Sequence, residues 1–90
     1  MNDPVLLRKE VRRILSAAPR DEKGKRRPLS EMKIFVLADR AARDPLHVDE
    51  LRAALNWNEA KGFAIQHFDE DEETTAWELS AEGAAKEGVK

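Results

Sequence analysis

Hydrophobic residues recur at helical spacing near the start of the chain. From Leu7 they follow at i+4, i+7, i+8 and i+11, which places them on one face of an α-helix. Asp3 is a suitable N-cap and Pro4 suits the first helical position. Pro19 disfavours helical backbone at the residue before it, so the pattern predicts a helix over residues 4–18. The basic residues off its apolar face are Arg8, Lys9, Arg12 and Arg13.

A polar segment comes next, and a second helical pattern follows it. Residues 19–28 contain no large apolar side chain, and residues 25–27 are all basic, so we expect an exposed, mobile loop. Ser30 is a suitable N-cap for the next element. The apolar run in residues 33–38 fits a buried strand on composition alone, but the cap and the alanines that follow favour a helix over residues 30–43.

The second half of the chain predicts one more helix and a β-hairpin. Apolar residues at helical spacing predict a helix over residues 48–61, and Gly62 is a natural C-terminal stop. Two short runs of alternating or β-branched and aromatic residues predict a hairpin over residues 63–80. Five consecutive acids, residues 69–73, form its tip. The small and charged residues 81–90 are expected to fray.

Composition limits the class of protein. Ninety residues fit one domain, here residues 1–90, with one modest core. The chain has no cysteine, which excludes disulfides, thiolate metal sites and thiol catalysis. No apolar run approaches the length of roughly 18 residues that a membrane span needs, and the first residues do not resemble a signal peptide. We therefore expect a cytoplasmic protein without a membrane partner.

The charge is distributed unevenly along the chain. The net charge is −2, but residues 1–45 carry twelve Lys or Arg against seven Asp or Glu, a net +5. Residues 46–90 carry four Lys or Arg against eleven Asp or Glu, a net −7. A basic half and an acidic half attract different partners.

Two segments near the hairpin resemble the winged helix-turn-helix superfamily. Residues 58–64 look like the end of a recognition helix, a glycine and the first wing strand. Residues 77–83 look like the second wing strand and its exit, which also ends in a glycine. The resemblance covers roughly residues 29–84 and is shared by MarR-like and ArsR-like regulators and by short phage-type winged-helix proteins. It implies a mainly α fold of three helices with a small two-stranded wing.

The helix positions can be assigned in a second way. Asn58 stands where the superfamily usually has a leucine. In the second assignment residues 30–43 and 48–56 are the first two motif helices, and residues 58–68 form the recognition helix. We prefer the first assignment because it explains Gly62 and gives the wing both of its strands.

The resemblance implies a non-enzymatic nucleic-acid-binding or transcription-regulator-like module, and this is the leading hypothesis. Arg and Asn on the exposed face of the third helix can read guanine and adenine edges. Basic side chains of the first helix and the loop are suited to phosphate contacts. The candidate nucleic-acid-binding residues are Arg8, Arg12, Arg13, Lys25, Arg26, Arg27, Arg52 and Asn56.

The acidic half supports an alternative function. Acidic groups on the third helix and at the hairpin tip are repelled by a duplex, so the protein is alternatively a protein-interaction winged helix with a basic protein partner, such as a phage-type accessory protein. A tip that serves only solubility and a homodimer both remain open. The candidate protein-interaction residues are Asp49, Glu50, Asp69, Glu70, Asp71, Glu72 and Glu73.

The sequence indicates no catalytic site. It contains no nucleophile–base pair, phosphate loop or nucleotide fingerprint, so we expect no enzyme and no cofactor. His47 and His67 are the two histidines, and two histidines without neighbouring ligands do not make a zinc site. We therefore expect no catalytic residues and no metal ligands.

Overall fold

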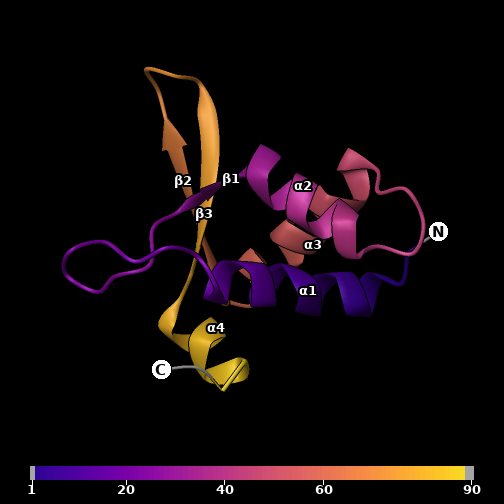
Figure 1. Ribbon diagram of the computed structural model, residues 1–90, viewed down its shortest axis with the longest axis horizontal. Coiled ribbons are helices and arrows are strands. Elements are labelled where there is room, and N and C mark those ends of the chain that lie inside the picture. The colour runs from indigo at the N-terminus through magenta and orange to yellow at the C-terminus, as the bar shows by residue number, and fades with distance from the viewer. Residues whose placement is uncertain (1, 89–90) are drawn as a thin grey trace.

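The computed structural model describes residues 2–88, which form a small α+β fold (Figure 1). These residues contain four helices and one three-stranded antiparallel sheet. The three predicted helices and the predicted hairpin are confirmed, whereas a third strand and a C-terminal helix were not predicted. In chain order the elements are α1 (Pro4–Ser16), β1 (Leu29–Ser30), α2 (Glu31–Ala41), α3 (Val48–Ala60), β2 (Ala64–Asp69), β3 (Thr74–Leu79) and α4 (Ala81–Lys86).

Side chains cap the first two helices as the sequence predicts. The Asp3 side chain accepts a hydrogen bond from the Val5 amide at the start of α1, and the Ser30 side chain accepts one from the Lys33 amide at the start of α2. Each bond satisfies an amide that has no partner within its helix. α1 ends at Ser16, two residues before the predicted end.

The second assignment of the helices is wrong, because a strand occupies the place of its recognition helix. Gly62 adopts a positive φ of 79° and turns the chain out of α3, a conformation that side chains with a Cβ rarely adopt. β2 then runs antiparallel to β3, with Ala64 opposite Leu79 and Asp69 opposite Thr74. The hairpin therefore begins directly after α3.

The strand β1 joins the hairpin and gives the sheet the order β1-β3-β2. Leu29 lies opposite Trp77, and Ser30 lies opposite Ala76. A strand of two residues is too short to produce a recognisable alternation in the sequence. Ser30 also caps α2, so the sheet and the helical layer meet at one residue.

The core lies between the helices and the base of the sheet. Its fully buried apolar side chains come from α1, α2, α3 and β3, and they are Val11, Leu15, Ile34, Leu55 and Trp77. The Trp77 indole Nε1 donates a hydrogen bond of 3.0 Å to the Glu31 carboxylate, so the buried ring keeps a partner for its polar atom. This bond ties β3 to the first turn of α2.

The C-terminal segment is a helix packed on the hairpin base, so the prediction that residues 81–90 fray is wrong for residues 81–86. Ser80 caps α4 by accepting from the Gly83 amide, and its hydroxyl donates to the Gly62 carbonyl. A Cβ at Gly83 would lie 2.2 Å from the Phe63 carbonyl oxygen, so only glycine allows this close approach. Residues 89 and 90 lie outside the described part of the chain.

None of the helices in residues 2–88 is both long enough and apolar enough to cross a membrane.

Candidate nucleic-acid interface

A groove with a volume of about 520 Å³ runs between the C-terminal half of α1 and α2. Apolar side chains such as Ile14 and Leu37 lie along it, and three cationic side chains flank them. Of the described residues that line it, none is acidic. We call it the basic groove, and its lining residues are Arg13, Ile14, Ala17, Ala18, Pro19, Leu29, Lys33, Leu37, Arg40 and Ala41.

Two of the three cations in this groove were not among the residues predicted from the sequence to bind nucleic acid. Lys33 and Arg40 are exposed and stand at i and i+7 on α2, with the half-buried Leu37 at i+4 between them. This spacing places all three side chains on one helical face. The pattern was present in the sequence, but only the packing of α1 against α2 makes that face one wall of a groove.

The loop of residues 19–28 adjoins the basic groove, because Pro19 at its start and Leu29 directly after its end line the groove. An isolated bridge between Arg20 and Arg26 closes the loop. The Asp21 carboxylate accepts hydrogen bonds of 2.9 Å from the Lys23 and Lys25 amides. Asp21 therefore serves the backbone of the turn, while the side chains of Lys23 and Lys25 remain exposed.

The other members of the predicted basic run differ in exposure. Arg27 is exposed, whereas Arg26 is half-buried and its Nε donates a hydrogen bond of 2.9 Å to the Ser16 carbonyl. Arg26 thus fastens the loop to the end of α1. Within the run of residues 25–27, Lys25 and Arg27 have exposed side chains that are accessible to a phosphate.

Arg13 borders the groove but is not an isolated charge. Its guanidinium forms bidentate hydrogen bonds with the Glu10 carboxylate, with Nε 3.0 Å from both carboxylate oxygens. This hydrogen bonding and the charge of Glu10 raise the pKa of Arg13. Since the side chain of Arg13 is 60% exposed, it keeps donors for a second anion.

Two further basic residues predicted on α1 are engaged within the protein. Arg12 is only 6% exposed. Its Nε donates to the Glu87 carboxylate at 2.6 Å and its Nη1 donates to the Asn58 Oδ1 at 3.0 Å, so Arg12 is a structural residue. The guanidinium of Arg8 lies over the Trp57 ring at 4.6 Å, which holds it against α3.

Arg52 and Asn56 lie on a different surface from the basic groove. α3 buries Leu51, Ala54 and Leu55 against the core, so its opposite face, with Arg52 and Asn56, is turned to solvent. The Nε of Arg52 lies 3.7 Å from the Glu31 carboxylate. The exposed acids Asp49 and Glu59 also belong to α3.

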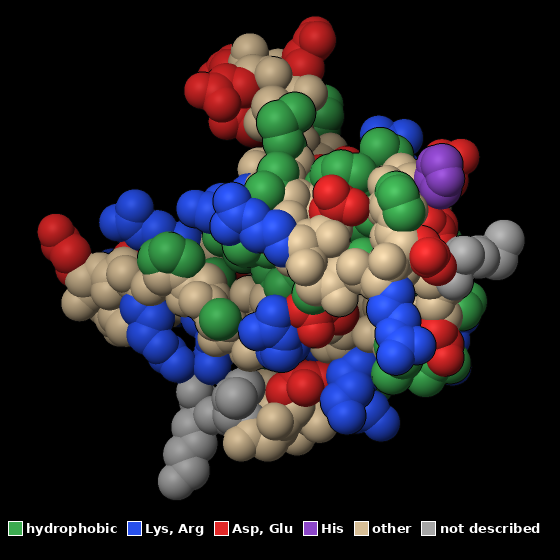
Figure 2. Space-filling view, turned by 45° about the vertical axis from the view of Figure 1, so that its right-hand side comes forward, with side chains coloured by type: hydrophobic (Ala, Val, Ile, Leu, Met, Phe, Trp, Pro, Cys, Tyr) green, Lys and Arg blue, Asp and Glu red, His purple; other side chains and the backbone are tan. Residues whose placement is uncertain are grey.

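The acidic residues of the alternative hypothesis occupy two environments. All five side chains of the tip, residues 69–73, are exposed, and Figure 2 shows them gathered at the end of the hairpin. Glu50 instead accepts hydrogen bonds from the His47 amide and from Asn2, and these bonds, with that from His47 the strongest, lower its pKa. Glu50 therefore caps α3 and is hydrogen-bonded to Asn2.

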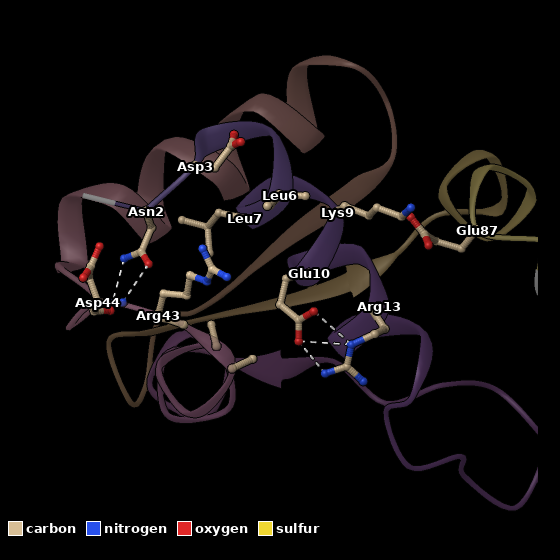
Figure 3. A pocket seen from close by; sticks show the side chains of 13 residues that line it. Asn2, Asp3, Leu6, Leu7, Lys9, Glu10, Arg13, Arg43, Asp44 and Glu87 are labelled. Atoms are coloured by element: carbon tan, nitrogen blue, oxygen red, sulfur yellow. Dashed lines mark hydrogen bonds and ion pairs between the residues drawn. The ribbon is translucent and has the colours of Figure 1, made fainter.

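A second groove, of about 700 Å³, lies at the other end of the α1–α2 contact (Figure 3). Basic and acidic side chains both line it, and in the close-up Glu10 points to Arg13 while Asn2 bonds with Asp44. Because opposite charges are mixed there, this groove has no preference for anions.

Residues 2–88 contain no group of three or more His, Asp or Glu side chains placed to hold a metal ion. His67 is hydrogen-bonded to the Glu78 carboxylate at 2.6 Å on the exposed hairpin. The candidate site is the surface formed by the basic groove and the adjoining loop.

No family model, curated protein or solved structure matches this chain.

Proposed function

We propose that the chain is a winged-helix module that binds nucleic acid through the basic groove and the loop of residues 19–28. The observation that carries the proposal is the absence of acidic side chains among the described lining residues of the groove, which has Arg13, Lys33 and Arg40 on its sides. Phosphate neutralisation by Lys and Arg supplies much of the affinity of proteins for nucleic acid. The winged-helix assignment is supported by two consecutive helices, α2 and α3, that run into a projecting hairpin.

This interface differs from one formed by α3 and the hairpin tip. The exposed face of α3 offers Arg52 and Asn56 beside Asp49 and Glu59, and the tip adds five carboxylates. A duplex placed on that surface would meet more negative than positive charge, which opposes binding. The basic groove and the loop present the reverse balance. We therefore place the phosphate contacts on the α1–α2 side of the molecule. We expect little discrimination between sequences, because phosphate contacts carry no sequence information directly.

The test is a fluorescence anisotropy titration of random-sequence duplex and single-stranded DNA. At about 20 mM salt the screening length is about twice that at 0.1 M, so weak phosphate contacts become measurable. The basic-face variant replaces Lys25, Arg27, Lys33 and Arg40 with Ser. We expect weaker binding and a salt slope reduced by roughly 0.9 for each phosphate contact that is lost on duplex DNA.

Two further variants make the result specific. Lys61→Ser with Lys86→Ser removes exposed positive charge elsewhere on the protein and should change affinity little. Arg52→Ser with Asn56→Ser tests the face of α3 and should also have little effect. Absence of binding by the parent protein at low salt would refute the function. Loss of binding only in the α3 variant would refute the location.

A second candidate function is docking onto a protein through the hairpin. Phe68 is 60% exposed and directly precedes the acidic tip, and an exposed aromatic side chain is a common anchor of protein interfaces. Replacing Phe68 with Ser should not weaken DNA binding and should weaken association with a basic protein. A loss of DNA affinity in that variant would argue against this division of roles.

A further inference from the structure

The hairpin end and the basic groove are complementary in chemistry. At the hairpin end an exposed aromatic ring, Phe68, stands beside the five carboxylates of residues 69–73. In the groove an apolar floor stands between Arg13 on one side and Lys33 and Arg40 on the other. Aromatic side chains bury large areas on docking, and opposed charges on the two surfaces speed encounter and fix orientation.

The hairpin cannot place its tip in the groove of its own chain. β2 and β3 are paired over all six residues of each strand, from Ala64–Leu79 to Asp69–Thr74, and β1 pairs with β3 at Trp77 and Ala76. This pairing fixes the direction of the hairpin. Figure 1 shows its tip as the part of the molecule furthest from α1, whereas α1 forms one wall of the groove.

We propose that the hairpin end of one copy of this chain docks into the basic groove of a second copy. The Phe68 ring enters between α1 and α2 and contacts Leu37 and Ala41. The carboxylates of the tip then lie beside Lys33 and Arg40. This docking does not rest on nucleic-acid binding, but it occupies the same groove, so a docked copy and a phosphate backbone exclude each other.

The proposed contact between two copies is heterologous and weak. Two different surfaces meet, so the interface is heterologous, and repeated docking produces assemblies larger than a dimer unless a ring closes. One hairpin end in one groove is smaller than a standard interface, which is typical of transient association. The charges are exposed, so association should weaken as salt rises.

The first measurement is the mass of the protein without nucleic acid, by analytical ultracentrifugation. We expect the weight-average mass to rise with concentration at about 20 mM salt and to return to the monomer at about 300 mM, where the screening length is several times shorter. Phe68→Ser should abolish the rise. A parent protein that stays monomeric at low salt up to millimolar concentration overturns the proposal.

The decisive measurement is a charge exchange between two variants. The groove variant is Lys33→Glu with Arg40→Glu. The tip variant is Glu70→Lys, Asp71→Lys, Glu72→Lys and Glu73→Lys, which leaves the turn-forming Asp69 intact and makes the tip cationic. Each variant alone brings like charges together and should remain monomeric. In an equimolar mixture each contact between the two different variants opposes unlike charges, so the mixture should associate. A mixture that stays monomeric, or a single variant that still associates as the parent does, overturns the proposal.

Two controls separate a second copy from another occupant. Lys61→Glu with Lys86→Glu, which carries the same charge change away from the groove, should associate as the parent does. A labelled peptide of residues 67–74 should bind the parent and not the groove variant, and the peptide with Ser in place of Phe68 should bind at least tenfold more weakly. If the parent is monomeric and the peptide nevertheless binds, the groove takes an acidic segment of a different protein, and the proposal of a second copy is wrong.

Discussion

The buried contact between Arg12 and Asn58 gives the sharpest prediction about stability. Asn58 is fully buried. Its Oδ1 accepts from Arg12 Nη1 at 3.0 Å, and its Nδ2 donates to the Ala54 carbonyl at 2.9 Å and to the Arg8 carbonyl at 3.2 Å. We predict that Asn58→Ala lowers the free energy of unfolding by about 2–4 kcal/mol, since a hydrogen bond to a charged group contributes about 1.5–3 kcal/mol and a small cavity adds to the loss.

The measurement is urea denaturation followed by tryptophan fluorescence, which reports on Trp57 and Trp77. For a domain of this size each kcal/mol lowers Tm by roughly 4–8 °C, so a thermal melt gives an independent value. The matched control is Asn56→Ala, the same substitution two residues away on the exposed face of α3. A surface change of this kind should stay within about 0.5 kcal/mol of the parent.

A compensating variant tests the cause of the loss. If Asn58→Ala destabilises because it leaves the buried Arg12 guanidinium with one partner fewer, the pair Arg12→Met with Asn58→Leu should recover most of the stability. The pair also carries Glu87→Gln, because loss of the bond from Arg12 would otherwise leave a carboxylate that is only 14% exposed without this partner. If Asn58→Ala and Asn56→Ala are equally stable, or if the pair is less stable than Asn58→Ala alone, our reasoning is refuted.

Three further predictions follow from contacts elsewhere in the fold. Because the pKa of Glu50 is lowered in the folded protein, chiefly by the His47 amide, its contribution to stability is present above the usual carboxyl pKa of about 4.3 and is lost as pH falls through the lowered value. The stability difference between the parent and Glu50→Gln should therefore shrink as pH falls below about 4.3, as measured by urea melts at several pH values; a difference that does not depend on pH would contradict this. Gly83→Ala should cost about 1–3 kcal/mol through overpacking against the Phe63 carbonyl, with a loss of helix signal in circular dichroism, and Ala85→Gly on the exposed side of α4 is the comparison. Leu15→Ala should cost about 2–5 kcal/mol, because Leu15 is 1% exposed in the core; an unfolding free energy within 1 kcal/mol of the parent would argue against that packing.

Several tertiary features had no readable signal in the sequence. β1 has two residues and is a strand only because β3 lies beside it. α4 has six residues, too few to be stable alone, and it forms because Gly83 fits against the Phe63 carbonyl and Ser80 caps it. The basic groove likewise depends on how α1 meets α2, which no single stretch of sequence records.

The sequence by itself determined the elements whose signals are local. Apolar spacing and caps such as Asp3 and Ser30 gave the three main helices, and Gly62 gave the point where α3 ends, because helix caps and left-handed turns are decided by neighbouring atoms of the same segment. Only the tertiary structure decided which charged side chains are exposed to solvent and which are bound within the protein. Arg12 has the sequence context of a surface cation, but it is buried on Asn58 and Glu87, which are 46 and 75 residues away. Helical spacing alone does not tell whether a residue at the edge of the apolar face is buried or exposed. The side chains that cover that edge come from segments that are distant in the sequence.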